Sequence, residues 1–123
     1  MQIRRIKNTN KFLIVGTDGT ILFLENDIIT KEPLLTSFAY YGFDQNEDGS
    51  ELLLVGWHGL SAWYKDSSWK IINTGTNSFL EGVTYIGNGL WFSAGWYGRL
   101  MVFNSYEGTW STLQTGRAEN IAY

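Results

Sequence analysis

Short apolar segments alternate with glycine-containing turns along the chain, and the pattern repeats about every 40 residues. An apolar run that ends in glycine occurs three times, 40 and then 39 residues apart, at Val15-Gly16, Val55-Gly56 and Ala94-Gly95. Each glycine is followed three residues later by a second glycine, and then by another apolar segment. These second segments are residues 20–24, 60–64 and 99–103. Several matches at one spacing indicate an internal repeat.

Each unit contains four short segments rich in Val, Ile, Phe, Tyr, Trp and Thr, separated by Gly, Asn, Asp or Ser. This composition is typical of β-strands, and no segment has sustained helical periodicity. The G-x-x-G step predicts a tight hairpin, because glycine adopts positive φ without steric cost. Four strands per unit predict a β-propeller blade. A β-sandwich of about ten strands is the alternative, but it gives no reason for the period.

The predicted fold class is all-β, a single domain of residues 1–123 built from three four-stranded propeller blades. The blades cover about residues 2–36, 37–78 and 79–114. Propellers typically have four to eight blades, so three cannot close a ring. An open arc would expose strand edges and apolar faces at both ends. We therefore predict that the chain associates with itself, most simply as a homodimer with six blades.

The chain contains one more inner-strand segment than three blades need. Residues 118–123 match residues 80–85 better than residues 2–7 do. This match predicts that 118–123 form a clasp, an inner-type strand that completes the first blade of a neighbouring copy. Residues 2–6 would then be displaced to an edge or to the rim, and the reverse assignment stays open.

Residues 75–95 resemble the repeat of Asp-box propellers, the sialidase-type or BNR-like family, in the stretch LEGVTYIGNGLWFSAG. The box that follows is similar, but SYEGTW at residues 105–110 is shortened and lacks the aspartate. The resemblance covers roughly residues 10–123 and implies a propeller fold. It does not specify a function, because such repeats occur in glycosidases, photosystem assembly factors, cell-surface proteins and phage tail proteins alike.

The net charge, the cysteine and histidine content and the length of the apolar runs exclude several classes of function. The net charge of −3 does not favour binding to nucleic acid polymers, which basic surfaces bind. The absence of cysteine excludes disulfides and thiol chemistry, and a single histidine excludes multi-histidine metal sites. No apolar run is long enough to span a bilayer. The start, MQIRRIKN, has no apolar stretch behind its arginines, so we expect no signal peptide, and both a cytoplasmic and a virion-associated location fit.

Propeller topology predicts that the G-x-x-G hairpins and the connections between blades meet on one face. Aromatic side chains at hairpin tips are unusual, because large apolar groups are normally buried, and they suggest binding. The predicted ligand-binding residues are Asp18, Trp57, His58, Glu81, Trp96, Tyr97, Arg99, Arg117, Glu119 and Asn120. The alternative is that Trp57 and Trp96 are wedges between blades. We expect Trp69, Trp91 and Trp110 in the core, and one of Trp63 and Tyr64 in solvent.

No catalytic, metal or cofactor site is predicted. Sialidase chemistry needs an arginine cluster, whereas the four arginines here share no repeat position, and nothing sets the spacing of two carboxylates for glycoside hydrolysis. Arg4-Arg5 is expected to be solvated edge charge, and residues 44–51 (DQNEDGSE) an ordinary solvated hairpin turn, since they lack the ligand order of a calcium loop.

The sequence thus favours a non-catalytic, lectin-like propeller that recognises a small carbohydrate, or another ring-shaped ligand, by stacking on tryptophan. Two alternatives remain open. One is sequestration of a soluble nucleotide-like or aromatic metabolite, and the other is a structural or assembly propeller that binds a protein partner.

Overall fold

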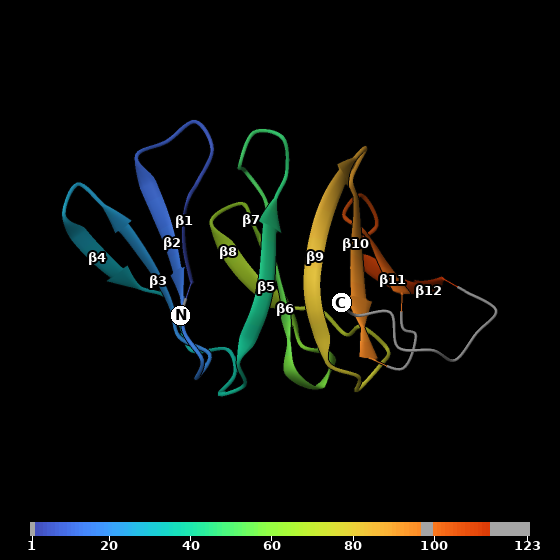
Figure 1. Ribbon diagram of the computed structural model, residues 1–123. Coiled ribbons are helices and arrows are strands. Elements are labelled where there is room, and N and C mark those ends of the chain that lie inside the picture. The colour runs from blue at the N-terminus through green and yellow to red at the C-terminus, as the bar shows by residue number, and fades with distance from the viewer. Residues whose placement is uncertain (1, 97–99, 114–123) are drawn as a thin grey trace.

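The computed structural model describes residues 2–96 and 100–113, and it consists of three four-stranded antiparallel sheets (Figure 1). Sheet 1 contains β1 (Gln2–Arg5), β2 (Lys11–Val15), β3 (Ile21–Glu25) and β4 (Ile28–Lys31). Sheet 2 contains β5 (Tyr40–Gln45), β6 (Leu52–Gly56), β7 (Ser61–Lys65) and β8 (Ser68–Ile71). Sheet 3 contains β9 (Leu80–Gly87), β10 (Leu90–Gly95), β11 (Leu100–Asn104) and β12 (Thr109–Leu113). The predicted all-β class and the four-stranded units are confirmed.

A 3₁₀ turn, η1 (Trp57–Gly59), lies between β6 and β7, and no α-helix occurs among the described residues. None of the described residues forms a helix long and apolar enough to cross a membrane.

Every sheet is a meander in which strands that follow each other in sequence lie side by side. The repeat places the central hairpins in the same register, with cross-strand partners Val15 and Ile21, Val55 and Ser61, and Ala94 and Leu100. In sheet 1 of the single chain, β1 pairs with β2 along its whole length and occupies the inner-strand position, which is the reverse assignment that the sequence left open. The predicted clasp, 118–123, lies outside the described residues and stays a prediction.

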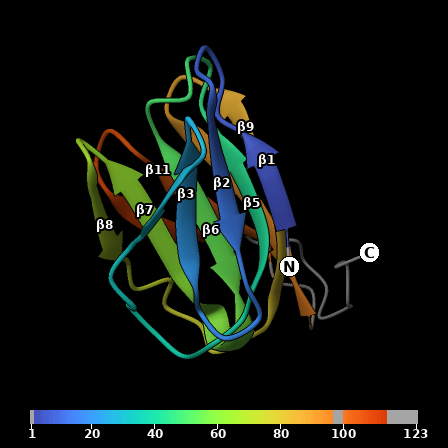
Figure 2. The same cartoon turned by 90° about the vertical axis from the view of Figure 1, so that its left-hand side faces the viewer.

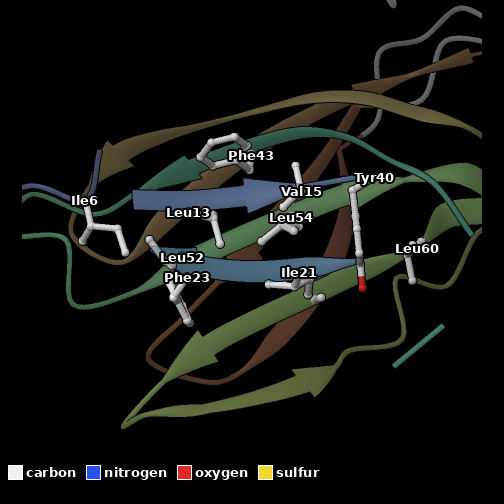
Figure 3. Close-up of a cluster of buried hydrophobic side chains, with 11 residues drawn as sticks. Ile6, Leu13, Val15, Ile21, Phe23, Tyr40, Phe43, Leu52, Leu54 and Leu60 are labelled. Atoms are coloured by element: carbon white, nitrogen blue, oxygen red, sulfur yellow. The ribbon is translucent and has the colours of Figure 1, made fainter. Parts of the chain in front are cut away.

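The three sheets lie face to face in chain order, and the chain passes between them at one end (Figure 1). Alternate residues of a strand point to opposite sides, so each sheet presents two different faces. Sheet 1 packs on sheet 2 through Leu13 and Val15 of β2, which meet Leu52 and Leu54 of β6 (Figure 3). This contact buries apolar area that stabilises the fold by roughly 25 cal/mol per Å².

The other face of sheet 2 packs on sheet 3, where Leu53 and Trp63 meet Trp91 and Phe103. All of β6 is buried because sheet 2 has a neighbour on both sides. For the same reason the expectation that Trp63 or Tyr64 faces solvent is wrong. Trp63 packs toward sheet 3, and Tyr64 packs toward sheet 1.

Trp91 is fully buried, as predicted. Trp69 and Trp110 are partly buried and pack on the cores between sheets 1 and 2 and between sheets 2 and 3, respectively. Both indole N–H groups donate a hydrogen bond toward the preceding sheet. Trp69 donates to Glu32, the residue directly after β4, at 3.1 Å, and Trp110 donates to Ser61 of β7 at 3.0 Å. Each outer-strand tryptophan therefore ties its sheet to the sheet before it.

One of two expectations about charged segments is corrected. Arg4 and Arg5 are exposed on the edge strand β1, as expected, and the guanidinium of Arg4 also lies 4.4 Å from the centre of the Phe43 ring. Its neighbour Arg5 donates from Nε to the carbonyl of Thr9 at 2.7 Å. Asp44 belongs to strand β5, so the turn that follows is shorter than residues 44–51.

Candidate functional site

A group of aromatic side chains gathers at the end of the sheets where the connections between sheets meet the β6–β7 and β10–β11 hairpins. We call this group the rim cluster, and its members are Phe38, Tyr41, Trp57, His58, Phe79 and Trp96. Trp57 is 43% exposed and Trp96 is 40% exposed. The cluster is an exposed aromatic surface of the kind that marks binding sites in soluble proteins.

The rings of the rim cluster form a continuous series from the start of sheet 2 to the hairpin of sheet 3. His58 lies 5.3 Å from Phe38 and 5.0 Å from Trp57, measured between ring centroids. Trp57 meets Phe79 edge-on at 6.2 Å, and Phe79 stacks on Trp96 at 5.3 Å. These separations match the offset and edge-to-face arrangements that aromatic pairs prefer.

The hairpin tip holds His58 in a left-handed conformation, with φ of 56° and ψ of 32°. Histidine is among the residues other than glycine that adopt this region more often, and six further non-glycine residues of the described chain do so as well. The tip is closed by a hydrogen bond from the Leu60 N–H to the Trp57 carbonyl at 3.0 Å. Thr74 adds a second constraint, because its hydroxyl donates to the Gly59 carbonyl at 2.8 Å. The β6–β7 tip is therefore fixed against the chain that leads to sheet 3.

A pocket of about 450 Å³ opens beside this tip. Its lining comes from the two connections that flank sheet 2 and from the start of β7. The lining residues are Leu35, Thr36, Phe38, Trp57, His58, Gly59, Leu60, Ser61, Ile71, Ile72, Asn73, Thr74, Thr76 and Asn77. Aromatic and aliphatic walls combined with a few amide and hydroxyl groups are typical of small-molecule sites. None of these lining residues, all within the described part of the chain, is Lys, Arg, Asp or Glu.

The structure brings together some of the predicted site residues. Trp57 and His58 line the pocket, and Trp96 joins them through Phe79. Glu81 lies beside Trp96 and accepts a hydrogen bond from its indole N–H at 3.4 Å. The pocket and the aromatic surface thus form one continuous site around the hairpins of sheets 2 and 3.

Asp18 has a different role in the structure. Its carboxylate accepts hydrogen bonds from the hydroxyl of Thr20 at 2.6 Å and from the N–H of the same residue at 3.2 Å. These hydrogen bonds lower the pKa of Asp18 below its usual value. The side chain stabilises the β2–β3 turn and does not line the pocket. Five further predicted site residues lie outside the described residues, namely Tyr97, Arg99, Arg117, Glu119 and Asn120.

Three members of the rim cluster were missed from the sequence, Phe38, Tyr41 and Phe79. Phe38 and Phe79 both lie just before an inner strand, where the connection reaches the hairpin tips, but they are not equivalent in the repeat. The N–H groups of Trp57 and Trp96 donate to the carbonyls of Ala39 and Phe79, so Ala39 occupies the position of Phe79. No repeated aromatic position in the sequence therefore marked this surface.

Across residues 2–96 and 100–113, no three His, Cys, Asp or Glu side chains lie close enough to hold a metal ion together. The pocket and the rim cluster supply ring faces, amides and hydroxyl groups, which can stack on a ligand and exchange hydrogen bonds with it. No protein-family model matches this chain, and no curated protein matches it.

Proposed function

We propose that this chain is a non-catalytic binding module that recognises a neutral sugar ring in the pocket beside the β6–β7 tip. The observation that carries the proposal is the pocket itself, in which Trp57 and Phe38 stand beside the side chains of Thr36, Asn73 and Asn77. An aromatic face contacts the C–H face of a sugar, while amides and hydroxyl groups exchange hydrogen bonds with its hydroxyl groups.

The polarity of the pocket favours a sugar over a nucleotide. A phosphate is usually bound by Arg, Lys or the N-terminus of a helix. The described lining contains no Lys or Arg, and the ring of its one histidine, His58, is engaged with Phe38 and Trp57. A volume of about 450 Å³ accommodates one or two sugar rings.

Ring closure belongs to the same proposal. Two copies of the chain would supply six sheets, within the usual range of four to eight blades. A closed ring would repeat the pocket around one face, and repeated sites increase the avidity for a multivalent glycan without any new contact. The resemblance to Asp-box propellers is compatible with this assembly.

A glycan array followed by titration calorimetry with neutral monosaccharides tests the ligand. We expect binding by the unaltered protein and at least a tenfold loss in Trp57→Ala. The matched control is Tyr106→Ala, which removes an exposed aromatic ring from the β11–β12 turn, outside the pocket lining. Stabilisation by purine nucleotides and not by sugars would favour metabolite sequestration. If neither sugars nor purine nucleotides bind, the proposed small-molecule ligand is wrong and a protein partner is favoured.

A further inference from the structure

The two terminal sheets each have an apolar face that no described part of the chain covers. Alternation and register place Arg5 and Lys31 on the two edge strands of the sheet-1 outer face, and they place the following apolar residues on the same face: Ile3, Phe12, Ile14, Leu22, Leu24 and Ile29. The same reasoning places the following residues on the sheet-3 outer face: Phe92, Ala94, Leu100, Val102 and Leu113. In Figure 2 the side of the molecule formed by sheet 1 is turned toward the viewer.

The repeat shows what the sheet-1 outer face is built to contact. Ile3 occupies the position of Phe43 in sheet 2 and of Val83 in sheet 3, at a spacing of 40 residues. Phe43 is buried against sheet 1, and Val83 packs on the core between sheets 2 and 3. Ile3 is 62% exposed at the same position. It therefore stands on the face that receives a preceding sheet.

The outer strand of sheet 1 repeats this relationship. Ile29 pairs with Leu24 and occupies the position of Trp69 and Trp110. Each of those tryptophans packs on the preceding sheet and donates a hydrogen bond toward it. Ile29 is 61% exposed, since sheet 1 has no preceding sheet within the described chain.

The sheet-3 outer face is the opposite kind of surface. Val102 occupies the position of Phe23 in sheet 1 and of Trp63 in sheet 2, both of which are buried against the sheet that follows. Phe92 likewise occupies the position of Leu13 and Leu53, which are also buried between sheets. Sheet 3 therefore presents the face that a following sheet would cover.

We propose that the sheet-3 outer face of one copy packs on the sheet-1 outer face of a second copy, in the same arrangement as sheet 1 on sheet 2. The two surfaces are different and complementary, so the contact is head-to-tail, and closure requires it twice. Two copies give six sheets, whereas three would exceed the usual number of blades. The inference rests on the ring closure in the proposed function but not on the sugar ligand.

Four substitutions at the two faces test the direction of this contact. Ile3→Asp with Ile29→Asp charges the sheet-1 outer face, and Val102→Asp with Leu113→Asp charges the sheet-3 outer face. Aspartate in an apolar interface should weaken association by roughly 100-fold or more. By light scattering we expect twice the chain mass of 14.0 kDa for the unaltered protein and the single-chain mass for each variant.

Mixing the two variants gives the decisive measurement. One variant keeps an intact sheet-3 outer face and the other keeps an intact sheet-1 outer face, so a head-to-tail contact restores a one-to-one complex. A contact between two identical faces would instead leave one variant dimeric alone and give no mixed complex. Circular dichroism of each variant establishes that it is folded before mixing.

Ile28→Asp is the matched control, because Ile28 is 67% exposed and adjoins Ile29 but pairs with Glu25, on the other face of β4. It should leave the mass unchanged. A dimer that survives both double variants would overturn the head-to-tail inference alone. A folded single chain at micromolar concentration in the unaltered protein would overturn the ring closure as well. If the protein is a dimer but does not bind sugars, the proposed ligand is wrong and the head-to-tail contact stands.

Discussion

The carboxylate of Asp44 accepts a hydrogen bond from the backbone N–H of Tyr85 at 2.7 Å, across the junction between sheets 2 and 3. Its other oxygen lies 3.6 Å from a guanidinium nitrogen of Arg4 in sheet 1. One side chain on the inner strand of the middle sheet thus links the inner strands of all three sheets.

Replacing Asp44 should separate the two contacts. Asp44→Ala removes both, and we expect the free energy of unfolding to fall by about 2 kcal/mol, because hydrogen bonds to charged groups are the stronger ones. Asp44→Asn keeps an acceptor for Tyr85 but removes the ion pair, which is half-exposed at Arg4 and contributes at most about 1 kcal/mol. Urea denaturation of both variants measures the difference. Equal losses would mean that the ion pair dominates.

Tyr40 carries a buried hydroxyl group with no hydrogen-bond partner among the described residues. Figure 3 shows this oxygen within the cluster between sheets 1 and 2. An unsatisfied buried polar group costs about 1–3 kcal/mol. Tyr40→Phe should therefore leave the free energy of unfolding at pH 7 unchanged or raise it by about 1 kcal/mol, as measured by chemical denaturation. A loss above about 1 kcal/mol would mean that the hydroxyl is satisfied.

The same side chain should make stability fall at high pH. Burial raises the pKa of Tyr40 from 10.0 to about 12. Between these values the unfolded state has released a proton that the folded state retains, so rising pH favours unfolding, by at most ~1.4 kcal/mol per pH unit. Below pH 10 the hydroxyl of Tyr40 is protonated in both states, so this loss of stability is absent there. Denaturation at pH 9 and pH 11 should show a smaller decline in Tyr40→Phe than in the unaltered protein.

The sequence predicts the sheets well because glycine pairs and apolar runs are local signals that recur at one spacing. It predicts burial less well, as Trp63 and Tyr64 show. A residue on an alternating strand has one solvent face only if its sheet has one neighbour, and the number of neighbours is a property of the whole fold. The head-to-tail ring stays a prediction, and so do the clasp at residues 118–123 and the site residues outside the described ranges.

The candidate site was predicted in part for a similar reason. Trp57 and His58 stand out because large side chains are rare at hairpin tips. Phe38 and Phe79 precede strands, and only the packing of the connections against the tips makes them part of the surface. Asp18 occupies a tip position as well, but its short carboxylate is used inside its own turn.

The wall of the pocket depends on a glycine that no other residue should replace. Gly59 has φ of +71°, and a Cβ built there would lie 2.0 Å from the Thr76 carbonyl oxygen. Gly75 has φ of +81°, but a Cβ built there would have no other atom within 4 Å. A substitution at Gly75 therefore measures the free-energy cost of the left-handed conformation without a steric clash. We expect Gly75→Ala to lower the free energy of unfolding by about 1 kcal/mol. Gly59→Ala should lower it by roughly 3–5 kcal/mol, since the backbone must also move.

Thermal and urea denaturation of both alanine variants check this contrast. Gly19 provides an internal repetition, because a Cβ there would lie 2.0 Å from the Thr36 carbonyl oxygen at φ of +83°. Gly19→Ala should therefore resemble Gly59→Ala in stability. Similar small losses at Gly59 and Gly75 would contradict the tight approach of the connection to the tip.

Trp57 and Trp96 should differ in what they contribute, although they occupy equivalent hairpin positions. Trp57 lines the pocket, whereas Trp96 is outside the lining, stacks on Phe79 and donates to Glu81. Trp96→Ala should lower the free energy of unfolding by about 1–2 kcal/mol and change sugar affinity less than twofold. Trp57→Ala should lower sugar affinity at least tenfold at a similar cost in stability, and Trp57→Phe should retain part of the affinity because a ring face remains. Calorimetric titration beside urea denaturation separates the two effects. If Trp57→Ala instead unfolds the protein, its ring is a packing element between sheets, and the sugar site beside it is wrong.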